Sequence, residues 1–261
     1  MENASVTIVI ITFNEEIMLP FTIDHYRKMF KNPKFVIWDN HSTDQTISIA
    51  EKEGCEINYF STDGMNDTRQ SEIKSRAAME CTTDWCICID ADELCFVTDY
   101  DLLSTKSNII QFQGWDIFQN VQSPWLALPE GCRSAGYSKP CCIKVNEFST
   151  IKFAAGAHAI ESIIAKSGFT AKWSKDEFNL LHYKHWSPEW VVSRSAFLAS
   201  RQSDENKKKG HSYHFAFSKE KHLEWWNEHY NLREVIQEPR LKLKEEIVNL
   251  NNDGSITINN A

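Results

Sequence analysis

Short apolar runs alternate with stretches of helical periodicity along the first hundred residues. The apolar runs are rich in β-branched or aromatic side chains, which is typical of buried strands in a parallel sheet. The four predicted strands cover residues 6–12, 35–38, 56–60 and 85–89. The helices predicted between them cover residues 15–30, 45–53 and 68–81, with Ser42 or Thr43 as a cap of the second. Strands and helices that alternate with short connections predict an α/β fold, with a mostly parallel sheet and helices on both faces.

The pattern after residue 100 is less regular. We expect a strand over residues 108–115, a loop rich in Pro and Gly over 123–140, and a pair of strands over 141–145 and 150–153. The residues after this region complete the α/β domain, which we expect to cover residues 1–186.

A helical pattern begins at Ser187. Pro188 suits the first turn of a helix, because its missing N–H would have no partner there in any case. The polar tail after Asn249 is expected to fray. We therefore expect a helical C-terminal extension over residues 187–261, packed against the α/β domain.

The composition is that of a soluble globular protein, with 42% hydrophobic and 25% charged residues among 261. A formal net charge of −8 argues against a nucleic-acid partner, because proteins that bind a phosphate backbone usually present a basic face. The apolar run near the amino terminus is too short to span a bilayer and follows no basic segment, so we expect no transmembrane segment and a cytoplasmic protein. The eight cysteines form no C-x-x-C pair and are expected to be free thiols.

Two carboxylates follow the fourth predicted strand directly, at Asp90 and Asp92. Strand geometry places residues i and i+2 on the same side, and carboxylates that lie close together repel each other unless a cation separates them. Mn²⁺ or Mg²⁺ suits such oxygen ligands and keeps positions open for a substrate diphosphate. Other polar clusters also follow predicted strands, and ligands of parallel sheets bind at the carboxyl ends of the strands.

Three motifs in this order give the sequence its family resemblance. They are Thr12-Phe13-Asn14-Glu15, the segment from Trp38 to Asp44 (WDNHSTD), and the segment from Asp84 to Glu93 (DWCICIDADE). The sequence resembles the GT-A fold glycosyltransferases of family 2, densely over residues 5–95 and thinly beyond. The resemblance implies a GT-A α/β fold whose donor-binding half covers about residues 1–100 and whose acceptor half covers about 101–186.

The resemblance also implies roles for individual residues. The nucleotide sugar would contact Thr12, Phe13, Asn14, Glu15, Asp39, Arg76, Asp90 and Ala91, with Asp39 hydrogen-bonded to the base. The metal would be held by Asp90, Asp92 and a late histidine, for which we choose His182. The catalytic base of an inverting displacement is left open among Glu161, Asp116 and His158.

We therefore expect a metal-dependent glycosyltransferase that moves a sugar from a nucleoside-diphosphate donor, UDP- or GDP-linked, to a hydroxyl of a glycan or lipid-linked acceptor. One alternative is a nucleotidyltransferase, although such an enzyme normally has a glycine- and basic-rich loop after the first strand. Another is a non-catalytic sugar-nucleotide or glycan-binding domain. Trp225 and Trp226 suggest either a peripheral membrane contact or an amphipathic helix packed on the domain.

Overall fold

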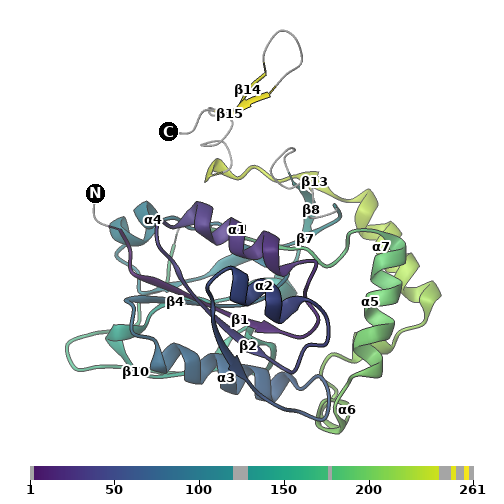
Figure 1. Ribbon diagram of the computed structural model, residues 1–261, viewed down its shortest axis with the longest axis horizontal. Coiled ribbons are helices and arrows are strands. Elements are labelled where there is room, and N and C mark those ends of the chain that lie inside the picture. The colour runs from purple at the N-terminus through teal and green to yellow at the C-terminus, as the bar shows by residue number, and fades with distance from the viewer. Residues whose placement is uncertain (1–2, 120–128, 176–177, 241–247, 251–255, 259–261) are drawn as a thin grey trace.

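The computed structural model describes residues 3–119, 129–175, 178–240, 248–250 and 256–258. Its centre is a six-stranded sheet in the order β3-β2-β1-β4-β9-β6, in which β3, β2, β1 and β4 run parallel (Figure 1). The strands are β1 (Val6–Thr12), β2 (Lys34–Asp39), β3 (Glu56–Tyr59), β4 (Trp85–Asp90), β6 (Ile109–Ile110) and β9 (Cys142–Lys144). The four strands predicted in the first hundred residues are confirmed.

The ends of three parallel strands meet at one edge of this sheet. Thr12 at the end of β1 is in register with Asp39 of β2, and Ile11 is in register with Asp90 of β4. The polar residues that follow these strands therefore lie side by side, as expected from the sequence.

Helices cover both faces of the sheet, as predicted (Figure 1). Alternate residues of β1 face opposite sides: Ile8 and Ile10 belong to the core that includes residues of α1, whereas Val9 belongs to the core that includes residues of α3. The helices of this half are α1 (Leu19–Met29), α2 (Thr46–Lys52), α3 (Asp67–Glu80) and α4 (Asp99–Ser104).

Two of these helices begin later than predicted. The first begins at Leu19 and not at residue 15, and Pro20 occupies its first turn. The second begins at Thr46, whose N–H donates to Asp44 Oδ1 at 2.9 Å, so the prediction of Ser42 or Thr43 as its cap is wrong.

A second sheet of five strands, in the order β13-β8-β7-β12-β5, stands beside the first. The turn at 90–93 carries the chain from β4 of the first sheet into β5 of the second. In the second sheet His182 is in register with Glu93 on one side and with Asp116 on the other. Its strands are β5 (Glu93–Cys95), β7 (Phe112–Ile117), β8 (Glu130–Arg133), β12 (Phe178–His182) and β13 (Glu234–Val235).

The middle of the chain differs from the prediction in three respects. The strand expected over 108–115 is split at Gln111 into β6 and β7, which belong to different sheets. The strand pair expected over 141–153 does not form, because β9 pairs with β4 and β6, whereas β10 (Phe148–Phe153) pairs with β11 (Ile160–Ala165). Of the loop expected over 123–140, residues 123–128 lie outside the described residues. Residues 129–140 contain β8 and a short 3₁₀ helix.

Within the described residues, three α-helices follow residue 187, and they lie along one side of the two sheets (Figure 1). The side chain of Ser187 caps the first of them and Pro188 begins it, as predicted. They are α5 (Pro188–Ser200), α6 (Asp204–Lys209) and α7 (Lys219–Asn231). The remaining elements are the 3₁₀ helices η1 (Ala135–Tyr137), η2 (Val145–Glu147), η3 (Ala155–Ala157) and η4 (Tyr213–Ala216) and the hairpin strands β14 (Val248–Leu250) and β15 (Ile256–Ile258). No helix among the described residues is long and apolar enough to span a membrane.

Candidate active site

A cavity of about 360 Å³ opens at the carboxyl ends of β1 and β4 and extends to α5. It contains most of the residues that the sequence singled out, although they are spread over 170 positions of the chain. The predicted residues that line it are Thr12, Phe13, Glu15, Asp90, Ala91, Asp92, His158 and His182. The two strand ends and the end of β12 are therefore parts of one site.

The turn after β1 is shaped by the loop after β2. Asp39 is fully buried, and its carboxylate accepts hydrogen bonds from Thr12 Oγ1 at 2.9 Å and from the Ser42 N–H at 2.7 Å. Asn14 adopts a left-handed conformation (φ 54°), and its Oδ1 accepts the Thr43 N–H at 2.8 Å. Asp39 does not line the cavity. Its carboxylate holds the 12–15 turn in place, and its contact with a nucleobase stays a prediction.

The first carboxylate of the Asp90-Ala91-Asp92 turn is bound by two buried lysines. Asp90 Oδ1 lies 2.7 Å from Lys74 Nζ, and Oδ2 lies 3.3 Å from Lys139 Nζ. Lys139 also forms an ion pair with Glu93, whose other oxygen accepts the Asp90 N–H at 3.1 Å. Both lysine side chains are only 2% exposed. Burial acts to raise the pKa of Asp90, but the two lysines outweigh it and hold this pKa well below its usual range.

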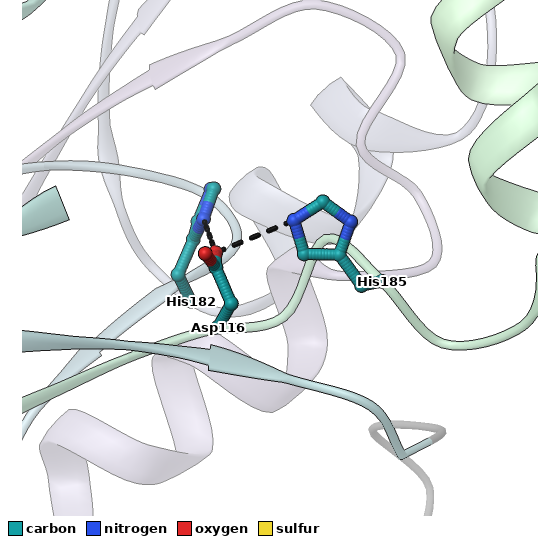
Figure 2. A group of neighbouring side chains, drawn as sticks. All are labelled: Asp116, His182 and His185. Atoms are coloured by element: carbon teal, nitrogen blue, oxygen red, sulfur yellow. Dashed lines mark hydrogen bonds and ion pairs between the residues drawn. The ribbon is translucent and has the colours of Figure 1, made fainter. Parts of the chain in front are cut away.

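The second carboxylate faces an imidazole from the other sheet. Asp92 Oδ2 lies 3.5 Å from His182 Nε2, and the other ring nitrogen of His182, Nδ1, lies 3.2 Å from Asp116 Oδ1. Asp116 is 3% exposed and does not line the cavity, so it lies behind His182 when viewed from inside the cavity. Figure 2 shows His182 and His185 on either side of this carboxylate, with His185 Nε2 at 3.3 Å from the same oxygen.

The charges around His182 explain its protonation. Burial acts to lower its pKa, but the carboxylates of Asp92 and Asp116 outweigh it and raise this pKa well above its usual value. His182 in turn lowers the pKa of Asp92 to about 2, against the effect of burial. His185 behaves differently, since burial lowers its pKa to about 4 despite the neighbouring Asp116. Of the two imidazoles beside Asp116, His182 is therefore charged and His185 is neutral at neutral pH when no metal is bound.

Two arrangements of these groups are able to hold a metal ion. Asp116, His182 and His185 present ligand atoms within 4.8 Å of one another, but only His182 of the three lines the cavity. Asp92 and His182 face each other inside the cavity, and Asp116 then holds the Nδ1 proton of His182. Metal-binding histidines commonly donate their other ring N–H to a carboxylate, as His182 does to Asp116 here. The pair of Asp92 and His182 therefore suits an ion that contacts substrate better than the cluster of Asp116, His182 and His185 does.

Helix α5 closes the opposite side of the cavity. Arg194 forms an ion pair with Glu15, and the guanidinium of Arg201 lies 3.1 Å from the centre of the Phe13 ring. Burial raises the pKa of Glu15 to about 7, although Arg194 acts in the opposite direction. The 12–15 turn is therefore covered by two arginines that lie beyond the residues of the family motifs.

His158 reaches the cavity from a strained turn between β10 and β11. Gly156 (φ 72°) and Ala157 (φ 55°) are both left-handed, and a Cβ on Gly156 would lie 2.7 Å from His158 Cδ2. The imidazole makes an edge contact with Tyr137, at 5.7 Å between ring centres. Burial and the nearby Lys139 lower the pKa of His158 to about 4, so its ring is neutral at physiological pH.

Four predicted site residues do not line this cavity, in addition to Asp39. Arg76 is exposed on α3, paired with Glu80 and stacked on Trp38, so it does not reach the site. Glu161 is exposed on β11 and paired with Lys152. The other two are Asn14, whose side chain supports the 12–15 turn, and Asp116, which lies behind His182.

Sequence reasoning missed four cations at or beside the cavity, which are Lys74, Lys139, Arg194 and Arg201. Lys74 follows Ser71 by three positions and precedes Ala78 by four, so it shares the buried face of α3 with small residues. That pattern was a usable signal, because a lysine on a buried helix face needs an acidic partner. Lys139, Arg194 and Arg201 offer no comparable local signal, because long-range packing brings them to the cavity.

The fold and cavity define an α/β protein with a site of carboxylates and imidazole at the carboxyl edge of a parallel sheet. Residues 7–101 match the sequence profile described as glycosyl transferase family 2, so the resemblance to this family is confirmed. A Rickettsia typhi protein named uncharacterized glycosyltransferase RT0209 is 27% identical over 230 residues, which cover 83% of this chain and 73% of that protein.

Two solved structures show a more distant likeness. Staphylococcus aureus TarS gives a TM-score of 0.43 with 13% identity over 75% of this chain, and this chain spans 39% of TarS. Glucosyl-3-phosphoglycerate synthase from Mycobacterium tuberculosis, solved with Mn²⁺, UDP and glucosyl-3-phosphoglycerate, gives a TM-score of 0.33 with 16% identity over 43% of this chain and 44% of that one. TM-scores below 0.5 do not place the site residues of this chain on theirs.

Proposed function

We propose that this protein is a metal-dependent glycosyltransferase that transfers a sugar from a UDP- or GDP-linked donor to a hydroxyl of a glycan or lipid-linked acceptor, with inversion. The observation that carries the proposal is the pairing of Asp92 with His182 inside the cavity that also contains the 12–15 turn. The match of residues 7–101 to family 2 supports the reaction class.

Asp92 and His182 are the proposed metal ligands, and His182 would release its Nε2 proton as the ion binds, because only the neutral imidazole is a ligand. Their mixture of carboxylate and imidazole suits Mn²⁺ better than Mg²⁺, which prefers oxygen ligands. A divalent ion held there supplies positive charge that stabilises the diphosphate as it leaves. Asp116 retains the proton on His182 Nδ1 and so directs Nε2 toward Asp92. Asp90 is oriented by Lys74 and Lys139 and is less available as a ligand than the sequence motif implies.

The acceptor hydroxyl must lose a proton during the displacement, and His158 is our proposed base. It is neutral and lines the cavity, and its turn fixes the position of the ring. Glu161 is a poorer candidate because it is exposed and paired with Lys152 outside the cavity. Asp116 is a poorer candidate because it lies behind His182. His158 would accept the proton at whichever ring nitrogen faces the acceptor.

A donor-turnover assay tests the proposal. Hydrolysis of UDP- and GDP-sugars is measured with Mn²⁺, with Mg²⁺ and with EDTA, for the native protein, for Asp92→Asn and for His158→Gln. Asp24→Asn is the matched control, because Asp24 is an exposed carboxylate paired with Lys28 on α1. We expect turnover that requires metal, falls at least about 100-fold in Asp92→Asn, and falls by a similar factor in His158→Gln while nucleotide binding is retained.

Several outcomes would contradict the proposal. Turnover in EDTA, or full activity of Asp92→Asn, would reject the metal assignment. Unchanged turnover in His158→Gln would reject His158 as the base. A native protein that binds no sugar nucleotide would reject the glycosyltransferase function itself, whereas release of diphosphate with formation of a sugar nucleotide would favour a nucleotidyltransferase.

A further inference from the structure

Two of the four Lys and Arg residues that line the cavity are paired with carboxylates in it. Of its four Lys and Arg residues, Lys139 is bound to Asp90 and Glu93, and Arg194 is bound to Glu15. Lys184 has no carboxylate partner in the part of the chain that the structure describes, but its Nζ lies 3.2 Å from the Tyr137 hydroxyl. Arg201 is the exception, because its side chain has neither an ion pair nor a hydrogen bond with any described residue.

The guanidinium of Arg201 instead lies over the ring of Phe13. Its central carbon is 3.1 Å from the centre of the Phe13 ring and 5.9 Å from that of Phe197. A stacked guanidinium uses its face for the ring and keeps its N–H donors in its own plane, where they are free for a ligand. Burial and the neighbouring Arg194 lower the pKa of Arg201 to about 10, so it is still charged at neutral pH.

The backbone at this point is fixed to the α/β domain. The carbonyl oxygen of Arg201 accepts the Met65 N–H at 2.5 Å, and the Ser203 N–H donates to Met65 O at 3.0 Å. Gly64 lies so close that a Cβ there would be 2.1 Å from the Arg201 oxygen. The end of α5 is therefore anchored to the loop that precedes α3, and Arg201 is held over Phe13 before any ligand arrives.

We propose that Arg201 binds the diphosphate of the donor, with Phe13 as the platform that orients the guanidinium. This inference rests on the proposed function. An arginine that lines the cavity without a carboxylate partner keeps its donors available for an anion, and the planar donors of arginine match the geometry of phosphate oxygens. The role predicted for Phe13 changes accordingly: the ring supports the cation that contacts the nucleotide.

Binding of UDP and of uridine separates this role from contact with the base. Titration calorimetry is performed on the native protein, on Arg201→Gln and on Arg201→Lys, with Arg69→Gln as the control, since Arg69 is an exposed arginine paired with Glu72 on α3. GDP and guanosine are used in the same way. We expect Arg201→Gln to weaken binding of the diphosphate by about ten- to a hundred-fold and to leave binding of the nucleoside unchanged, with partial recovery in Arg201→Lys.

The possible results are distinct. Equal weakening of UDP and uridine would show that Arg201 contacts the base and would overturn the inference, as would UDP binding by Arg201→Gln that equals that of the control. Both results leave the proposed glycosyltransferase function standing. A native protein that binds neither UDP nor GDP would reject that function and this inference with it. Circular dichroism melts of each variant show whether it is folded.

Discussion

Lys139 lies in a buried charge cluster, and we expect its loss to lower the stability of the protein substantially. Its side chain is 2% exposed, and its ammonium group lies between Asp90 and Glu93, whose side chain is 1% exposed. Lys139→Met removes the cation but leaves Glu93 buried with no cation beside it, whereas Asp90 keeps Lys74. Breaking a buried ion pair on one side typically costs about 3–5 kcal/mol. That is a large part of the roughly 5–15 kcal/mol that separates folded from unfolded domains.

Urea unfolding followed by circular dichroism measures this cost. The control is Lys152→Met, because Lys152 pairs with Glu161 at the surface, where both side chains are more than half exposed. That pair is worth about 0–1 kcal/mol. A double variant, Lys139→Met with Glu93→Leu, should recover most of the loss, since apolar residues of similar size often replace a buried pair at little cost. If Lys139→Met costs no more than Lys152→Met, the buried charge cluster is not important for stability and the reasoning is refuted.

Two further predictions concern the carboxylates of the site. Asp116→Asn should lower the affinity for Mn²⁺ by about 10- to 100-fold without unfolding the protein, because His182 loses the charge that orients it. Titration calorimetry measures this affinity, with Glu161→Gln as the control. Equal Mn²⁺ affinities of the two variants would contradict the prediction. The pKa of Glu15 is raised to about 7 from 4.5, so the folded state binds this proton more tightly than the unfolded chain does. The resulting stabilisation is fully present below about pH 4.5 and is lost as the pH rises through about 7. In Glu15→Gln, the free energy of unfolding should no longer show this part of its pH dependence. If the dependence persists in the variant, it belongs to another group.

The donor half was predictable because its signals are local. Each parallel strand is a short apolar run followed at once by polar residues, so the sequence of 6–12 or 85–89 is sufficient to identify both the strand and the edge where it ends. Register then brings Thr12, Asp39 and Asp90 together without further information, since neighbouring parallel strands share one edge. The burial of Asp39 was not predictable in the same way, because it depends on the loop that folds over this residue.

The second sheet was not predictable from periodicity. Its strand β5 has only three residues, and β12 pairs with a strand about 65 positions earlier in the chain. Periodicity over three residues carries no signal, and long-range pairing leaves none in a single sequence. Asp116 and His182 were therefore named separately, as base and metal ligand, although the register places them side by side.

The turn at 90–93 also acts as the joint between the two sheets. The chain leaves the parallel sheet at Asp90 and enters the second sheet at Glu93, and Asp92 between them faces His182 from a distant strand. A ligand that bridges Asp92 and His182 therefore ties together two layers that are otherwise joined here by a turn of the chain. At a free concentration one hundred times its dissociation constant, such a ligand would stabilise the folded state by about 2.7 kcal/mol. Binding of a ligand at this site is therefore measurable as a rise in the melting temperature of the protein, before any substrate is identified.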